Sequence, residues 1–291
     1  MTELYIDGTS VVLPADFSTS VKRENPFFTK NGEYTYDITL QLSNSINADL
    51  YEHLNRLNSI AELKTKRQAV LVADNRVYCN GTEIITGWTD STVSIQIASG
   101  NSELNSFIGN DLLVSSLDMG EDEIPTGIIN NLVKRIYPDV DYCIPPVMTD
   151  KGVINGWRVA VTVVTTSKPT ISPNYLRETG VDIYLQPYLC AYIRKLMKAL
   201  GYTVLTNQLE DSEWNLLYLP QNGHPNQYAK MFPGWTINEL ITEFESFFNL
   251  CFLVNNRKKE VSILFRAEYF KNAQVCHVQQ VVDEYETEEG E

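Results

Sequence analysis

Histidine and cysteine are scarce in this chain, which limits the metal and redox chemistry that it can carry. The 291 residues include three histidines and five cysteines. No CxxC or HExxH motif occurs, and no two histidines lie three to five residues apart. A zinc ribbon, a dithiol redox motif and a helical zinc-protease motif are therefore excluded. Cys190 and Cys251 fall within apolar segments, where we expect them to pack as small hydrophobic residues.

Basic residues are also few, and long apolar runs are missing. Lysine and arginine number 23 against 37 acidic residues, which gives a net charge of −14. Because phosphate binding needs clustered basic side chains, we expect no specific nucleic-acid binding and no docking on anionic membranes. No stretch of about 18 apolar residues occurs, so no membrane span is expected. Residues 1–13 lack the features of a signal peptide, which favours folding in a reducing cytoplasm.

The familiar catalytic and phosphate-binding motifs are missing as well. The sequence has no GxSxG, no Walker A and no GxGxxG pattern. Acid pairs such as Asp111/Asp118 or Glu121/Glu123 would serve a glycosidase only if the fold set them across a cleft. We expect surface or turn positions for the three histidines, which are His53, His224 and His277. The sequence thus predicts no catalytic, metal-binding or cofactor-binding residue, and no cofactor.

Apolar residues make up 43% of the chain and aromatics 11%, enough for substantial cores. Residues 1–120 show short alternating segments separated by turns. The clearest is 34–42, in which aromatic and aliphatic side chains occupy every second position. A short helix over 47–58 is the one expected interruption. This pattern predicts a β-rich domain, either an antiparallel barrel or a sandwich.

The remainder of the chain reads as a mixed connecting region over 121–185 followed by an α+β domain over 186–282. In the connecting region we expect a helix at 127–137 and a β-branched strand at 157–164. In the α+β domain we expect a helix at 186–200, strands at 202–205 and 214–219, and a final hairpin formed by 252–254 and 261–265. The overall expectation is an α+β fold with two main helices and short hairpins.

One helix start is especially clear. Thr236 and Glu239 have the spacing of a capping box, in which each side chain bonds the other residue's backbone amide. Apolar residues then recur at helical spacing. The residues that we expect to be buried against the helix containing Ile193 and Leu196 are Ile237, Leu240, Ile241, Phe244 and Phe248. We assign Phe247 to the core as well, because it shares this apolar face.

Two features of the sequence leave alternatives open. Phe27 and Phe28 are adjacent aromatics in a turn-rich segment, so they are candidates for a subunit contact or for burial over the open end of the local barrel. Residues 283–291 carry six acids and no base. This acidic tail is a solvated terminus, an arm that docks on a basic patch of a neighbouring protein, or a segment that lines a pore.

Several segments together resemble a known group of proteins. They include the opening Leu4–Gly8, the Asn25–Thr29 and Tyr34–Leu40 pair, the Ile97–Asn105 and Leu117–Gly120 segments, and Tyr228–Ile241 with its P-x-W-T-x-x-E helix start. The chain resembles structural tail proteins of phages and prophages of Bacteroides-type bacteria. The last segment is also similar to the baseplate hub family, which includes the Mu-like tail hub and prophage tail proteins labelled endopeptidase-like.

The resemblance implies a tail-tube-like β-barrel at the N-terminus and a ring-like homo-oligomer, with three copies expected. It implies a virion protein, made in the host cytoplasm, that joins the tail tube to the spike or tip proteins and forms part of the DNA conduit. An acidic lumen would repel DNA phosphate. Members of the family are often longer, so a complete second barrel is not expected here.

Two other classes of function remain open beside the structural one. The first is a tail-associated cell-wall hydrolase or peptidase, which the missing catalytic motifs disfavour. The second is a glycan-binding adhesin at the tail tip, which would read host sugars through exposed tyrosine and tryptophan side chains.

Overall fold

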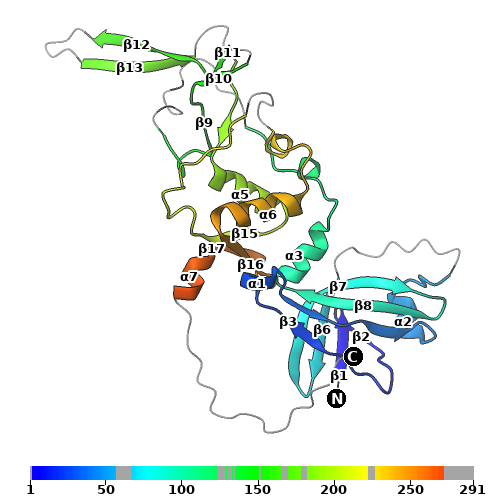
Figure 1. The fold of residues 1–291 in the computed structure, drawn as a ribbon. Helices are drawn as coiled ribbons and strands as arrows, with labels where there is room; N and C mark the ends of the chain where they lie inside the picture. Colours follow the sequence, from blue (N-terminus) through cyan, green and yellow to red (C-terminus); the bar gives the residue numbers. More distant parts are fainter. Residues whose placement is uncertain are drawn as a thin grey trace.

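The computed structural model describes residues 2–56, 67–122, 129, 133, 135–150, 152–164, 170–177, 182–221 and 227–271. Within them the chain is a mixed α+β protein with one large antiparallel sheet, several small sheets and few helices. Figure 1 shows the large sheet at one end, a central body built around two helices, and a long hairpin that extends from the other end. The expected α+β class is therefore confirmed.

The large sheet is built from short strands of the N-terminal part of the chain. Its order is β2-β1-β6-β7-β8-β4-β3, with β5 also paired to β8, and every pairing is antiparallel. Alternating apolar residues place one face in a core that contains Leu4, Ile38 and Ile95. The strands are β1 (Thr2–Ile6), β2 (Thr9–Val11), β3 (Val21–Arg23), β4 (Glu33–Thr35), β5 (Ile38–Gln41), β6 (Gln68–Ala73), β7 (Arg76–Trp88) and β8 (Thr92–Ser99).

The sheet does not close into the expected barrel within the described residues. Its terminal strands, β2 and β3, do not pair with each other. Strand β4 pairs with β8 at Ser99 and Ala98, and β5 pairs with β8 from Ile95 to Thr92. These two strands together occupy one side of β8, and neither pairs with β2. The large antiparallel sheet is confirmed, and the structure that forms is an open sheet.

The helix expected at 47–58 is shorter and begins earlier. Helix α2 (Ser45–Leu50) starts behind the N-cap Asn44, whose side chain accepts from the Ile46 amide at 2.9 Å. Glu52 and His53 then adopt φ values of 50° and 54°, which an α-helix does not allow. The expected helix was therefore wrong for residues 51–56, which are not helical. Residues 57 and 58 lie outside the described residues.

The central body contains a small mixed sheet of order β15-β17-β16. Strand β15 (Thr203–Asn207) is parallel to β17 (Glu260–Phe265), and β16 (Leu250–Asn255) is antiparallel to β17. The two main helices, α5 (Leu189–Ala199) and α6 (Ile237–Phe248), share one core with this sheet, as do Leu104 and Val114 from α3 (Asn101–Ile108) and the 3₁₀ helix η1 (Val114–Ser116). The last described helix is α7 (Arg266–Lys271).

The predictions for this body were correct in most places. The capping box at Thr236 is formed, and Ile237, Leu240, Ile241 and Phe244 are buried in the core that contains Ile193 and Leu196. Phe248 is partly buried against the same core. Phe247 was wrongly assigned to it, because 77% of its surface is exposed. The helix stop at Gly201 is confirmed by its φ of 86°.

The strand expected at 214–219 does not form. Residues 214–216 are turns, and only an isolated bridge joins Tyr218 to Tyr188. The carbonyl of Leu217 accepts from the Leu189 amide at 2.8 Å, so this segment caps the first turn of α5 instead of joining a sheet.

The described residues of the connecting region take part in three two-stranded sheets, one of which includes a strand at the start of the α+β domain. The long ribbon is formed by β12 (Trp157–Val164) and β13 (Thr170–Arg177), which confirms the expected strand at 157–164. A small core at its base contains Ile129, Ile144, Ile183 and Leu185. The helix expected at 127–137 lies mostly outside the described residues. The other strands are β9 (Tyr142–Cys143) paired with β14 (Gln186–Pro187), and β10 (Val147–Thr149) paired with β11 (Gly152–Ile154).

Among the described residues, no helix is long and apolar enough to cross a lipid bilayer. The acidic tail, at 283–291, and the preceding segment from residue 272 lie outside the described residues, as do His224 and His277.

Candidate functional site at the junction of two modules

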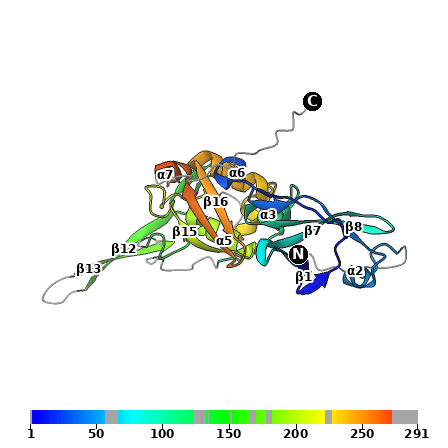
Figure 2. The same ribbon diagram turned by 90° about the horizontal axis from the view of Figure 1, so that it is seen from below.

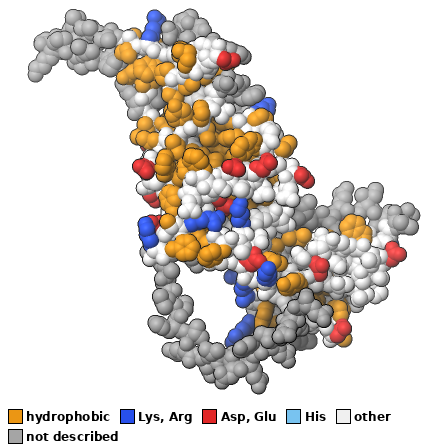
Figure 3. Space-filling view, in the orientation of Figure 1, with side chains coloured by type: hydrophobic (Ala, Val, Ile, Leu, Met, Phe, Trp, Pro, Cys, Tyr) orange, Lys and Arg blue, Asp and Glu red, His pale blue; other side chains and the backbone are white. Residues whose placement is uncertain are grey.

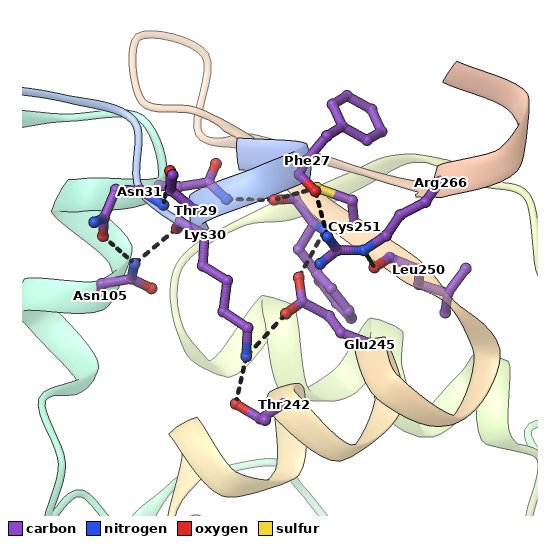
Figure 4. Close-up of polar contacts among 12 residues, drawn as sticks. Phe27, Thr29, Lys30, Asn31, Asn105, Thr242, Glu245, Leu250, Cys251 and Arg266 are labelled. Carbon is purple, nitrogen blue, oxygen red and sulfur yellow. Dashed lines mark hydrogen bonds and ion pairs between the residues drawn. The ribbon is translucent and has the colours of Figure 1, made fainter. Parts of the chain in front are cut away.

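The large sheet and the central body meet in a junction of polar contacts, which include an ion pair and several hydrogen bonds between the two parts (Figure 4). We call residues 2–99 the sheet module, and residues 101–122 and 186–271 the α+β module. The contacts that hold them together come from α1 (Pro26–Thr29) and the following turn on one side, and from α3, α6, β16 and α7 on the other.

The two candidate aromatic residues, Phe27 and Phe28, lie in α1 and not in a loop. Asn25 caps the helix by accepting from the Phe27 amide at 3.1 Å. Phe27 is buried at the junction, where α1 contacts β16, whereas 66% of the surface of Phe28 is exposed. The ring of Phe28 packs edge-to-face on Phe270 of α7, with 5.8 Å between ring centroids. Phe27 is therefore a packing residue, and Phe28 is available at the surface.

Arg266 ties α1 to the start of β16. Its guanidinium donates one hydrogen bond to the carbonyl of Phe27 and another, from Nε, to the carbonyl of Leu250 at 2.9 Å (Figure 4). Because the guanidinium is planar and holds its donors in fixed directions, these two bonds set the position of α1 relative to the α+β module.

A buried carboxylate forms the second contact. Glu245, on α6, is 6% exposed, and its Oε2 lies 3.4 Å from Nζ of Lys30 in the sheet module. The same Nζ donates to Thr242 at 3.0 Å, and Oε1 of Glu245 accepts from the Phe252 amide at 3.3 Å. A buried carboxylate without such partners would cost several kcal/mol. Lys30, from the sheet module, therefore supplies the positive charge that compensates the buried Glu245 carboxylate of the α+β module.

Asn101, at the start of α3, completes the free edge of β16. Its side-chain amide donates to the Phe252 carbonyl at 2.5 Å and accepts from the Val254 amide at 3.0 Å. These are the two bonds that a neighbouring strand would make, so the side chain occupies the place of a strand. Gly32 packs so closely here that a Cβ atom would lie 2.7 Å from the Ser99 carbonyl oxygen.

A cleft of about 390 Å³ opens beside this junction. The sheet module contributes Arg23, Tyr78 and Asn80 to its walls, and the turn between β16 and β17 contributes Asn256 and Arg257. Arg23 is held by Glu33, with 2.8 Å between Nε and Oε2, and donates to the Tyr78 carbonyl at 2.9 Å. The turn is basic, since it contains Arg257, Lys258 and Lys259.

The cysteine in the cleft wall is not arranged as a nucleophile. Cys79 is 1% exposed, and burial together with the nearby Glu33 carboxylate raises the pKa of its thiol to about 12. A nucleophilic cysteine needs the opposite, a lowered pKa and an exposed sulfur.

The acidic pairs considered from the sequence form turn and surface contacts. Asp118 accepts from the Gly120 amide at 3.2 Å, and Glu121 accepts from Gln227 at 3.2 Å. Glu123 lies outside the described residues. Nε2 of His53 lies 3.4 Å from a carboxylate oxygen of Asp49. In the described part of the chain no group of three or more histidine, cysteine or acidic residues could hold a metal ion.

The junction residues could not be found from the sequence. Lys30, Asn101, Glu245 and Arg266 belong to no motif, and their partners lie up to 239 positions away. The only local signals were the Asn25–Pro26 start of α1 and the glycine at position 32, which indicate a turn but not what packs on it.

Comparisons of the chain with models of protein families, with curated proteins and with solved structures found no match. The function is therefore inferred from the residues and from the arrangement of the modules.

Proposed function

We propose that this protein is a structural, non-enzymatic subunit of a phage or phage-like tail baseplate or hub. In this role it joins the tail tube to the tip proteins and forms part of the DNA conduit, in a ring-like homo-oligomer of three copies. The resemblance of the sequence suggests the assembly. The observation that carries the proposal is the long β12–β13 ribbon, which has the features of a segment that contacts another subunit. We call this ribbon the arm.

The ribbon has eight residue pairs, from Trp157↔Arg177 to Val164↔Thr170, and neither strand pairs with any other described strand. It extends away from the body in two perpendicular views (Figures 1 and 2). Residues 159–164 and 170–176 contain no charged residue. A two-stranded ribbon is marginally stable by itself, and long uncharged edges favour pairing with another chain. A neighbouring subunit would supply that pairing.

Two further features support an assembly role. Apolar side chains gather on the face of the central body shown in Figure 3. Two exposed aromatic residues of the α+β module, Phe247 and Trp214, contact the partly buried Phe248, with 4.7 Å and 6.1 Å between the ring centroids. Exposed apolar side chains that lie together on a surface mark interaction sites. We assign Phe28 and Phe270 to such a contact as well.

In this proposal the sheet module is of tail-tube type. Its edge strands, β2 and β3, pair with the sheets of neighbouring copies. The sheets of all copies in the ring together form a barrel-like wall. The junction would then hold the wall at a fixed angle to the α+β module. The net charge of −14 suits a conduit that must not retain DNA.

The test removes the arm and keeps its base. Replacing residues 161–173 by Asn-Gly would join Ala160 to Asn174, a pair in the ribbon register, through a two-residue hairpin turn. We expect native mass spectrometry to show a ring for the natural chain and a folded monomer for the variant. Met148→Ser, which removes another exposed apolar side chain of the connecting region, is the control and should keep the ring.

A natural chain that is monomeric at every concentration, or an arm variant that still forms the ring, would contradict the proposal. Digestion of peptidoglycan by the purified protein, lost on substitution of a single carboxylate or histidine, would replace it by the hydrolase alternative.

A further inference from the structure

We propose that the cleft at the module junction binds the acidic tail of the same chain, residues 283–291. This inference concerns the isolated subunit and is independent of the proposed assembly. It rests on the chemistry of the cleft, on the composition of the tail and on the length of chain between them.

The cleft offers cationic and amide groups that lack partners. Arg257, in its wall, and the adjacent Lys258 are exposed and form no ion pair with any described residue. Asn256, also in the wall, has a donor and an acceptor in its side chain that are withdrawn from solvent and make no hydrogen bond to the described residues. Figure 3 shows lysine and arginine side chains gathered at the level where the two modules meet. Such a site favours an extended peptide that carries carboxylates, because the arginine binds carboxylate and the amide can pair with a peptide group.

The acidic tail fits this description better than any other segment of the chain. Its nine residues carry six acids and no base, and they account for −6 of the net charge of −14. It also contains Tyr285, an aromatic ring that can pack on Tyr78, of which half the surface is exposed in the cleft wall.

The connecting chain is long enough for the tail to reach the cleft of its own copy. The basic turn precedes β17 and α7, which have six residues each, so the end of α7 lies at most about 30 Å from the turn at the usual rise per residue. Residues 272–282 are eleven residues, which span up to about 36 Å when extended. A tether of this length gives an effective concentration of roughly a millimolar, which suffices for a weak electrostatic contact. Docked in this way, the tail neutralises the basic turn and competes with any acidic partner for the cleft.

The first experiment measures binding of a fluorescent peptide with the sequence of residues 283–291. We expect the chain truncated after Val282 to bind it, and the full-length chain to bind it at least about tenfold more weakly because the tethered tail competes. Binding should weaken as salt rises, since screening shortens the reach of exposed charges. A peptide with asparagine and glutamine in place of the acids should not bind.

Charge reversal then locates the site. In the truncated chain Arg257→Glu with Lys258→Glu should abolish peptide binding. The matched control, Lys198→Glu with Lys230→Glu, changes the charge equally at two exposed lysines outside the cleft and should leave binding unchanged. Equal binding by the cleft variant, or loss in the control alone, would overturn the assignment.

The second experiment decides whether the tail acts within one copy. Trypsin cleaves after Arg257 and Lys258, so a docked tail should slow cleavage of this turn in the full-length chain, at low salt and equally at every protein concentration. A full-length chain with all six tail acids changed to amides should lose the protection without any deletion. Protection that grows with protein concentration would instead make the tail of a second copy the occupant, and equal cleavage of the two full-length chains would overturn the proposal.

Discussion

Phe244 and Phe247 lie one turn apart on α6 and have opposite surroundings. Phe244 is 8% exposed in the core of the α+β module, and Phe247 is 77% exposed. Phe244→Ala should therefore lower the free energy of unfolding by about 3–5 kcal/mol, because it leaves a cavity. Phe247→Ala should change it by about 0.5 kcal/mol or less. Urea unfolding of both variants checks this, and similar losses at the two positions would contradict the assignment of faces.

Glu210 makes the stability of the α+β module depend on pH. Arg194 donates to both of its carboxylate oxygens at 2.6 Å, and Tyr137 donates at 2.8 Å. Burial alone would raise the pKa of Glu210, but the hydrogen bonds from Arg194 and Tyr137 outweigh it, so the pKa lies below its ordinary value. A carboxyl with a lowered pKa stabilises the fold above the unfolded-state pKa of about 4.3 and loses this contribution as pH falls through the folded-state pKa.

We therefore expect Glu210→Gln to be less stable than the natural chain at neutral pH. The difference should shrink as pH falls below about 4.3, since the natural carboxyl also becomes neutral there. Melting temperatures of both chains across this range measure it. A difference that stays constant with pH would show that the carboxylate charge does not stabilise the module.

At the scale of elements, the free edge of β16 is closed by a side chain. Asn101→Ala would leave the Val254 amide without its partner and the Phe252 carbonyl with only a weak contact to the Cys251 thiol, at a cost of about 1–3 kcal/mol for each group that stays buried. We expect faster hydrogen exchange at the Val254 amide and a lower stability. Asn105→Ala, which removes a bond to the Lys30 carbonyl from the same helix, is the control and should leave exchange at Val254 unchanged.

The elements also differ in what decides their ends. Helix α6 begins where the capping box predicts, because both of its bonds join residues three positions apart. Helix α2 ends early because Tyr51 is buried and its hydroxyl donates to Glu83 at 2.5 Å, with Arg67 2.5 Å from the other carboxylate oxygen. The chain turns to left-handed backbone directly after this anchored residue, and no local pattern predicts it.

At the scale of the whole molecule, the junction should make the two modules unfold together. Lys30→Ala with Arg266→Ala removes the cationic partner of the buried Glu245 and the bonds to Phe27 and Leu250. We expect the natural chain to show a coupled calorimetric transition and the variant to show the sheet and α+β modules melting separately. Lys22→Ala, which breaks an ion pair with Glu24 inside the sheet module, should keep the coupling. Separate melting of the natural chain would contradict a rigid joint.

The tail should contribute little to the stability of the molecule. Truncation after Val282 removes six acids that offer no apolar surface to a core. The melting temperature should therefore change by about 2 °C or less, even with the tail held weakly in the cleft. A larger loss would mean that the tail forms part of the folded core.

The amino-acid sequence by itself determined those features that depend on residues a few positions apart. The α6 capping box, the buried face headed by Ile237, the stop at Gly201 and the β16–β17 hairpin all follow from local spacing, because their hydrogen bonds and their periodicity are local. The α+β class follows from the same patterns.

Only the tertiary structure decided which apolar residues meet a partner and where the modules join. Residue 247 fits the helical pattern as well as residue 244, but it lies on the exposed face of α6, while the following Phe248 packs against the core. The open edge of the sheet, the burial of Phe27 without Phe28, and the contacts of Lys30, Asn101 and Arg266 depend on partners up to 239 positions away. Such contacts form only when separate elements pack together, and for this reason local sequence patterns carry no record of them.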